Sequence, residues 1–391
     1  MQKKKLCLAI EEKLFKCKKE RLKDLRLNKI PLSLSVHLPW CETQCPYCDF
    51  SITTEPVDSN DVRLAEAIIK DIKHSSDLIA GRKFKSIYFG GGTPSLASTK
   101  SIKQILDSVR DRLESSSAEI TLEMNPNDVS EKKIEGLLEA GINRISLGIQ
   151  SYSDQELQAL GRNHDRKSAI RATKILKGIN TTIDLIYGIE KQTPESVAKN
   201  LETIIDSNIN HLSLYQLTIE PNTIFYKKEL LLPGEEAIEK MEVIAKDLLE
   251  KNGFEQYEVS SWSKPGCKSQ HNLNYWQFGD FLGVGPGSHS KISNNQEIMR
   301  YRKIKPLEGY IKSQNSTDLK TIAGNELDMD LAMNLLRIKN GLQHQDLTID
   351  LPASFLKKYQ RGVDEGLLLK GKVGATQKGY QFLNETIQLF F

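Results

Sequence analysis

The sequence contains no long hydrophobic run, and it has few cysteines for its length. No stretch of the 391 residues approaches the roughly 18 apolar residues that span a bilayer. The apolar run near the N-terminus breaks at Glu11, before it reaches the length of a signal peptide's apolar region. Six cysteines are too sparse for a disulfide scaffold, which favours a reducing compartment. We therefore expect a cytoplasmic protein.

The composition also argues against intrinsic disorder and against a nucleic-acid-binding surface. The chain is 39% hydrophobic and 27% charged, as folded proteins are. Residues 1–30 hold 11 Lys+Arg against 4 Asp+Glu and carry +7, whereas residues 31–391 hold 43 against 47 and carry −4. A nucleic-acid-binding domain usually has basic charge across a folded face. We expect no nucleic-acid partner, because the positive charge is confined to one end.

The basic N-terminal extension, residues 1–30, has the pattern of an amphipathic helix. Its apolar positions fall near one face at helical spacing, with lysines elsewhere; they are Ile10, Leu14, Cys17, Leu22 and Leu25. Such a helix can lie on an anionic membrane, so weak membrane-surface association is one expectation. The alternatives are a solvated extension or a start codon assigned too early.

From residue 31 to residue 221 the sequence alternates short apolar runs with helical patterns. We predict strands at Ser33–Leu38, Ser86–Phe89, Glu119–Glu123, Arg144–Gly148, Thr182–Ile186 and His211–Leu217. We predict helices at Arg63–Ile72, Lys103–Arg112, Glu131–Glu139, Asp154–Leu160, Ser168–Leu176 and Glu195–Ser207. Capping residues such as Ser130 and Thr193 precede two of them. Serial βα units imply a parallel sheet, and six of them fall short of a closed eight-stranded barrel. The predicted fold is therefore α/β, with a partial (βα)6 barrel.

The remainder of the chain is predicted as two smaller parts. Residues 222–320 form a mixed middle segment, which is irregular and rich in aromatics to about residue 300 and contains the loop Gly283–Gly287. Residues 321–391 form a small C-terminal domain, helical or winged-helix-like, with a β-like piece near Leu367–Val373. The sequence shows no internal repeat.

Three of the six cysteines, Cys41, Cys45 and Cys48, lie within eight residues, directly after the first predicted strand. Soft thiolates select zinc or iron–sulfur clusters. Structural zinc uses four protein ligands, and no fourth Cys or His follows at a paired spacing, so a zinc-stabilised binding module with a distant ligand is the weaker alternative. A cubane cluster on three thiolates leaves one iron free for an outside ligand. The spacing therefore favours an iron–sulfur cluster.

The cysteine loop and its position resemble those of the radical S-adenosylmethionine (SAM) superfamily, and within it the HemN/HemW group. The resemblance covers about residues 31–390. It implies that Cys41, Cys45 and Cys48 hold a [4Fe–4S] cluster, and that the methionine part of SAM chelates the fourth iron. It also implies that an electron from the cluster can split the sulfonium to give a 5′-deoxyadenosyl radical.

The same resemblance implies further SAM-binding residues at the carboxyl ends of the predicted strands, where a parallel barrel keeps its site. A glycine-rich loop, Gly90–Thr93, follows the second strand, and the exposed N–H groups of such a loop suit a carboxylate. The implied SAM contacts are Tyr47, Gly91, Gly92, Thr93, Glu123, Gln150, Arg162 and Asp184.

Two features favour the heme-chaperone branch of the group over oxygen-independent coproporphyrinogen III oxidase, which stays the alternative. The oxidases have a fourth cysteine two residues after the third, where this chain has Phe50. His271–Trp276 matches the HNxxYW motif of the chaperone branch, and imidazole is a common axial ligand of heme iron. The resemblance thus implies heme as a ligand, His271 as its iron ligand, and an acceptor hemoprotein as partner, a respiratory protein being one candidate.

Three other residues near these motifs bear on the prediction. Cys267 precedes His271 by four positions, and we expect a buried thiol there rather than a second heme ligand. Ser35 stands where the family usually has tyrosine near the cofactor, which predicts a weaker cofactor contact. His289 follows the Gly283–Gly287 loop, and the sequence assigns it no role.

Overall fold

The computed structural model describes residues 30–57, 60–294, 297–314 and 316–391. Within these ranges twelve strands form one mixed sheet, in the order β12-β11-β10-β9-β1-β2-β3-β4-β5-β6-β8-β7. The strands are β1 (Leu32–Leu38), β2 (Phe84–Gly91), β3 (Glu119–Met124), β4 (Arg144–Gln150), β5 (Thr181–Tyr187), β6 (His211–Gln216), β7 (Glu255–Glu258), β8 (Ser261–Ser263), β9 (Asp280–Val284), β10 (His289–Ser293), β11 (Ile298–Lys303) and β12 (Ser316–Ile322).

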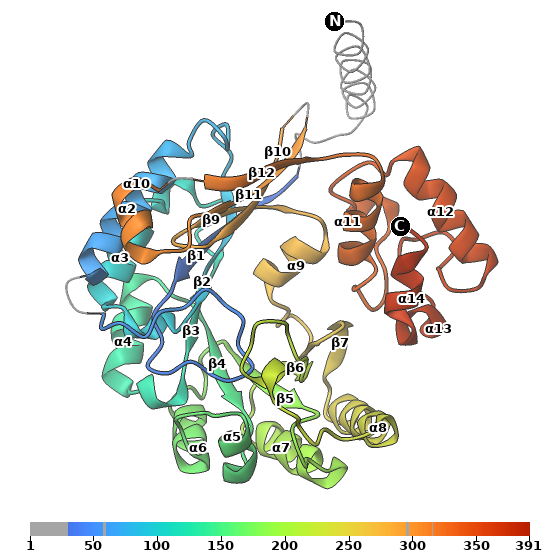
Figure 1. Ribbon diagram of the computed structural model, residues 1–391, viewed down its shortest axis with the longest axis horizontal. Helices are drawn as coiled ribbons and strands as arrows, with labels where there is room; N and C mark the ends of the chain where they lie inside the picture. Colours follow the sequence, from blue (N-terminus) through green and yellow to red (C-terminus); the bar gives the residue numbers. More distant parts are fainter. Residues whose placement is uncertain (1–29, 58–59, 295–296, 315) are drawn as a thin grey trace, which may run out of the picture.

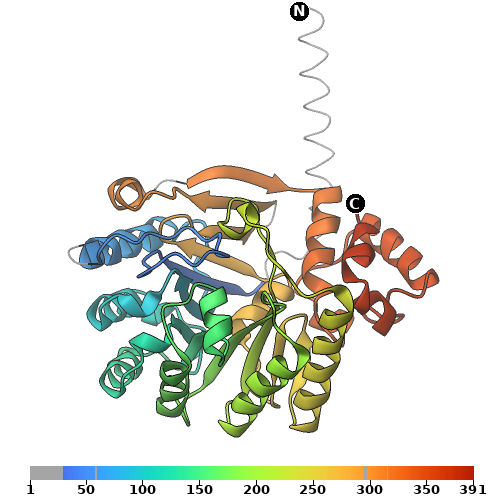
Figure 2. The same cartoon turned by 60° about the horizontal axis from the view of Figure 1, so that its bottom comes forward.

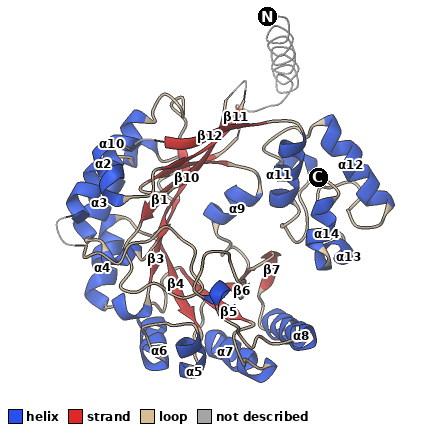
Figure 3. Cartoon of the chain, in the orientation of Figure 1, coloured by secondary structure: helices blue, strands red, loops and turns tan. Residues whose placement is uncertain are grey.

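The sheet curves, with most helices on its outer side and α9 on its inner side (Figures 1 and 3). The helices are α2 (Asn60–His74), α3 (Thr99–Asp107), α4 (Glu131–Ala140), α5 (Asp154–Ala159), α6 (Arg166–Ile175), α7 (Pro194–Asp206), α8 (Glu235–Lys251), α9 (Gln270–Trp276), α10 (Leu307–Ser313), α11 (Asn325–Leu335), α12 (Ala353–Asp364), α13 (Gln377–Gln381) and α14 (Leu383–Gln388). None of them, in the described ranges, has the length and hydropathy needed to cross a membrane.

The six predicted βα units are confirmed, and the partial barrel is their product. Strands β1 to β6 pair in parallel in sequence order, and β9 adds a further parallel strand on the free edge of β1. The N-caps predicted at Ser130 and Thr193 are present, because each side chain accepts a hydrogen bond from the backbone N–H three residues later. Figure 2 shows helices arrayed along the outer side of the sheet.

Alternation along the strands separates the core from the interior of the barrel. In β1 the residues Leu32, Leu34, Val36 and Leu38 are buried in the main hydrophobic core, whereas the intervening residues are polar. Parallel register places such polar residues in rows across the sheet. One row is Ser35, Tyr88, Thr121 and Arg144. A second contains Glu123, Ser146 and Thr182.

A second hydrophobic core lies in the C-terminal part of the chain. It joins residues of α11 and α12 to Phe278, and Trp276 at the end of α9 packs against it. The Arg337 guanidinium lies 4.3 Å from the Trp276 ring centroid, so the helical C-terminal part is fastened to α9.

The structure corrects two expectations about the later part of the chain. Residues 221–300 are not irregular, because they form α8, α9 and β7 to β10. The β-like piece near Leu367–Val373 contributes only isolated bridges, Leu342 to Val373 and Leu368 to Ala375. The basic extension, residues 1–30, lies outside the described residues apart from Ile30. The division at residues 30, 221 and 320 stays a prediction.

Candidate cofactor site

A cavity of about 480 Å³ lies inside the partial barrel. The three clustered cysteines and every residue predicted to contact SAM line it. They are Cys41, Cys45, Tyr47, Cys48, Gly91, Gly92, Thr93, Glu123, Gln150, Arg162 and Asp184. They come from the loop after β1, from β2 and the loop after it, from β3, β4 and β5, and from the turn after α5, so the fold unites residues that are up to 143 positions apart in the sequence.

The cysteine loop is tied down on both sides by backbone hydrogen bonds. The N–H of Cys41 donates to the Thr53 carbonyl at 2.9 Å, and the N–H of Thr53 donates to the Pro39 carbonyl at 2.8 Å. A turn closes between Cys48 N–H and the Cys45 carbonyl at 3.1 Å. All three thiols are half-buried, so the loop presents them to the cavity without sealing them in the core.

Burial favours the neutral form of two of these thiols. Burial raises the pKa of the Cys41 thiol, and it raises the pKa of Cys48 to about 11. Both are therefore neutral at pH 7 until a metal takes the place of the proton. Among the described residues, no group of three or more Cys, His, Asp or Glu side chains could hold one metal ion. The geometry thus gives no support to a zinc site, in which all ligands surround a single ion.

The glycine-rich loop lies against the backbone of the cysteine loop. The N–H of Gly92 donates to the Leu38 carbonyl at 2.9 Å, and that of Thr93 donates to the Trp40 carbonyl at 2.6 Å. A Cβ on Gly92 would lie 2.5 Å from the Trp40 carbonyl oxygen, closer than any real side chain. Only glycine permits this approach, which holds the two cavity-lining loops in contact.

Two half-buried carboxyl groups, those of Glu123 and Asp184, face the cavity. Glu123 accepts hydrogen bonds from the Tyr88 hydroxyl at 2.7 Å and the Gly91 N–H at 3.1 Å. Burial, helped by the charge of Asp184, raises the pKa of Glu123 to about 7. Burial also raises the pKa of Asp184 to about 6, although Ser146 donates to it at 2.9 Å. Such carboxyl groups favour a cationic ligand, because its charge offsets the cost of their burial.

Arg162 joins the cysteine loop to β3 and β4. Its Nη1 lies 3.4 Å from the Cys45 sulfur, and its Nη2 donates to Asn125 Oδ1 at 2.6 Å and to the Gly148 carbonyl at 3.0 Å. Gln150, at the end of β4, has a φ of +66°, and this left-handed turn follows an irregularity in the pairing of β4 with β5. The strained backbone ends the strand where its side chain meets the cavity.

His271 lies beside this cavity but does not line it. The residue is 2% exposed. Nδ1 lies 2.9 Å from the Ser86 hydroxyl, and Nε2 lies 3.3 Å from that of Ser35. The ring stacks on Tyr88, with centroids 4.9 Å apart. Burial lowers the pKa of His271 to about 3, so the imidazole is neutral. The sequence motif therefore forms a packed, hydrogen-bonded histidine.

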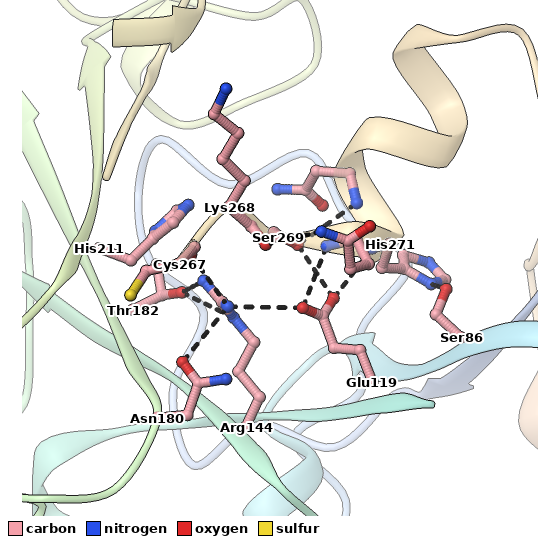
Figure 4. Close-up of polar contacts among 12 residues, drawn as sticks. Ser86, Glu119, Arg144, Asn180, Thr182, His211, Cys267, Lys268, Ser269 and His271 are labelled. Atoms are coloured by element: carbon pink, nitrogen blue, oxygen red, sulfur yellow. Dashed lines mark hydrogen bonds and ion pairs between the residues drawn. The ribbon is translucent and has the colours of Figure 1, made fainter. Parts of the chain in front are cut away.

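Cys267 differs from the prediction of a buried thiol. It is half-buried, and its sulfur lies 3.7 Å from the Pro265 carbonyl oxygen. The reason is local, since the preceding residues Pro265 and Gly266 are exposed. Figure 4 shows the Cys267 side chain directed away from the His271 ring.

Comparison with known proteins identifies the family. The Radical SAM superfamily model matches residues 35–204. The chain is 35% identical to heme chaperone HemW of Buchnera aphidicola subsp. Acyrthosiphon pisum, over 92% of this chain and 98% of that protein. It is 37% identical to heme chaperone HemW of Escherichia coli, over 79% and 83% of the two chains. The chain belongs to the HemW family of radical SAM proteins.

A solved structure supports the fold of this HemW family member. The structure of coproporphyrinogen III oxidase (HemN) from Escherichia coli, a radical SAM enzyme, matches with a TM-score of 0.76 at 23% identity. The match covers 94% of this chain and 92% of that one. At this identity the likeness establishes the shared architecture only.

Sequence reasoning missed several residues that line the cavity of this HemW family member. Asn125 is one, and its amide links Arg162 to Thr93. Its position beside Glu123 in the Glu-Met-Asn-Pro run was an available signal. Thr121 and Arg144 are others. Thr121 lies two residues before Glu123 on a predicted strand, and Arg144 lies four residues before Gly148 on the next. Because every second residue of a strand faces the same side, the strand prediction was enough to place both on the cavity side.

Proposed function

We propose that this chain is a cytoplasmic heme chaperone that works with a SAM-bound [4Fe–4S] cluster. Cys41, Cys45 and Cys48 hold the cluster, and the predicted residues around the cavity hold SAM at the open iron. When bound, the cluster supplies a site for SAM and an electron that can cleave it. Heme is the cargo, and it passes to an acceptor hemoprotein.

One observation carries the cofactor part of this proposal. Three half-buried thiols, a glycine-rich loop and two half-buried carboxyl groups converge on one cavity of about 480 Å³. The donor set fits the cofactors chemically. Thiolates are cluster ligands, while the Glu123 and Asp184 carboxyl groups suit the amine and sulfonium charges of SAM. Membership of the HemW family supports the heme part.

The hydrogen bonds of His271 support its role as the iron ligand. Nδ1 lies 2.9 Å from the Ser86 hydroxyl, which is itself 2.8 Å from the Ser33 hydroxyl. Ser86 can therefore accept the Nδ1 proton in the tautomer that leaves the Nε2 lone pair free. The Nε2 contact with Ser35 is the longer one, at 3.3 Å, and Ser35 is only half-buried. Iron binding requires that Nε2 leave Ser35, while the bond to Ser86 can persist.

The test is anaerobic reconstitution, followed by spectroscopy with SAM and then heme added in turn. We expect about four iron and four sulfide per chain, an electron paramagnetic resonance spectrum that changes with SAM, and a heme Soret band. Loss of iron and sulfide binding in a variant with all three cysteines changed to alanine is expected. Zinc without iron or inorganic sulfide would overturn the cofactor proposal.

Two buried histidines allow a matched test of the heme ligand. His271→Ala should lose heme binding and keep the cluster, because the His271 ring contacts Ser35, Ser86 and Tyr88, which lie on β1 and β2. His211 is 1% exposed and bonds to the Tyr257 hydroxyl at 2.8 Å, so His211→Ala creates a comparable defect in β6 and should keep heme. Equal heme binding by wild type and His271→Ala would remove His271 from the proposal.

We also propose that residues 1–30 give weak association with anionic membranes. The support is their charge of +7 and their helical pattern. Flotation with liposomes that contain anionic lipid should show binding by the full chain. If a chain without residues 1–30 floats equally well, this proposal is wrong.

A further inference from the structure

The cavity extends beyond the residues that we assign to SAM. Alternate residues along the whole of β4, from Arg144 through Ser146 and Gly148 to Gln150, line it. Gln150 lies at the carboxyl end of the strand, and Arg144 lies at the amino end. The cavity therefore has a second polar region at the amino ends of the strands, which we call the floor.

The guanidinium of Arg144 keeps hydrogen-bonding capacity at this floor. It is 2% exposed, and its Nε and Nη2 donate to Thr182 Oγ1 at 3.2 and 2.8 Å. The three contacts of Nη1, with Glu119, Asn180 and the Cys267 carbonyl, are all 3.4 Å long, at the weak limit for a hydrogen bond. A guanidinium has five N–H donors in a planar fork, and these contacts do not saturate it.

The ion pair of Arg144 with Glu119 is long, at 3.4 Å. Its partner Glu119 also accepts hydrogen bonds from the N–H groups of Gln270 and His271, at 3.0 and 2.9 Å, and from the Ser269 hydroxyl at 3.2 Å. Figure 4 shows Glu119 between Arg144 and the start of α9. Because four donors share the oxygens of this carboxylate, its long contact leaves room for a second carboxylate to bind Arg144 more closely.

Thr121 gives an independent sign of a ligand. It lies beside Arg144 in the β3–β4 register, lines the same cavity and is 1% exposed. Its hydroxyl has no hydrogen-bond partner among the described residues. Buried polar atoms are nearly always paired, so this hydroxyl and the Arg144 fork together point to an acceptor-rich group that binds between them.

We propose that Arg144 and Thr121 form a carboxylate subsite that receives a propionate group of heme. Arginine matches a carboxylate with two parallel N–H donors, and the threonine hydroxyl adds a third. The carboxylate of SAM is expected at the open iron instead. Ser35, which contacts His271, belongs to the same register row as Thr121 and Arg144. The inference rests on the proposed heme function and adds the recognition of its carboxylates.

The experiment compares ferric heme with heme dimethyl ester. The esterified propionates carry no negative charge and cannot pair with arginine as carboxylates do. Binding to the reconstituted full chain is followed by fluorescence quenching and by the Soret band. Wild type should bind heme at least about tenfold more tightly than the ester. Thr121→Val should weaken heme binding about threefold to tenfold and leave ester binding unchanged.

Thr181→Val is the matched control, since Thr181 is 3% exposed, lies in β5, and bonds to the Ile179 carbonyl instead of facing the cavity. It should leave the affinity for both ligands unchanged. Equal affinity of wild type for heme and its ester, or an equal loss for both in Thr121→Val, would overturn the subsite while the heme function stands. If neither ligand binds to wild type, the heme function fails and the subsite falls with it. Compared with SAM, decarboxylated SAM should bind more weakly by the same factor to wild type and to Thr121→Val. A loss seen only with wild type would mean that the subsite binds the carboxylate of SAM and not that of heme.

Discussion

Gly92→Ala tests whether the contact between the glycine-rich loop and the cysteine loop holds the cluster site together. The new Cβ would lie 2.5 Å from the Trp40 carbonyl oxygen and 2.7 and 2.8 Å from the Pro39 carbonyl carbon and oxygen. Ordinary contacts begin near 3.4 Å, and all three atoms are backbone, so no side chain can rotate away. The loop must retreat by almost 1 Å, which costs about 1–3 kcal/mol as overpacking.

The retreat also stretches the hydrogen bond from Thr93 N–H to the Trp40 carbonyl, now 2.6 Å long, and adds about 1 kcal/mol. We expect Gly92→Ala to lower the free energy of unfolding by about 2–4 kcal/mol and to reduce iron and sulfide content after reconstitution. Urea unfolding and metal analysis measure the two effects. Gly234→Ala is the control, since Gly234 has nothing within 4 Å and a φ of −70°. A variant at Gly92 with full iron content and a loss below about 1 kcal/mol would refute the reasoning.

Three further predictions concern charged groups around the cavity. Arg162→Lys should lower SAM affinity about tenfold or more in calorimetric titration, because lysine cannot bridge Asn125 and the Gly148 carbonyl as a fork does; unchanged affinity would contradict this. The pKa of Glu123 is raised by burial to about 7, so the folded protein binds this proton more tightly than the unfolded chain, and cofactor-free stability should fall as pH rises from about 4.5 to about 7. Glu123→Gln should reduce this pH-dependent loss of unfolding free energy by about 3 kcal/mol. If urea unfolding at the two pH values shows the same loss in the variant as in wild type, the prediction is wrong. Glu119→Ala leaves Arg144 and the first N–H groups of α9 without their acceptor and should cost about 3–5 kcal/mol; a loss below about 1 kcal/mol on urea unfolding would show that the pair is unimportant.

The partial barrel could be predicted because its signals are local. Strands β1 to β6 are short apolar runs, and helices such as α4 and α7 carry their own caps. The site followed from the fold, since residues at the carboxyl ends of parallel strands must meet at one edge. Glu123 and Asp184 are 61 positions apart in the sequence, yet both face the same cavity.

The middle of the chain could not be predicted in the same way, because its elements are defined by distant partners. Strand β9 has only five residues and begins with the buried Asp280, whose charge is matched by Lys291 at 2.8 Å and Arg82 at 2.9 Å, so its apolar run is short. Its pairing with β1 joins segments about 250 residues apart. Helix α8 could have been predicted from the sequence, because Met241, Ala245 and Leu249 repeat at helical spacing. The hydrogen bonds of His271 also depend on strands far away in the sequence.

The most direct test of the central claim places heme and coproporphyrinogen III side by side. Anaerobically reconstituted protein, with SAM and a reductant present, is given each compound in turn, and an apo-hemoprotein is then added to the heme sample. The account predicts stable binding of heme, its release to the acceptor, and no turnover of coproporphyrinogen III. Formation of protoporphyrinogen at enzymatic rates, with no heme transferred, would contradict it.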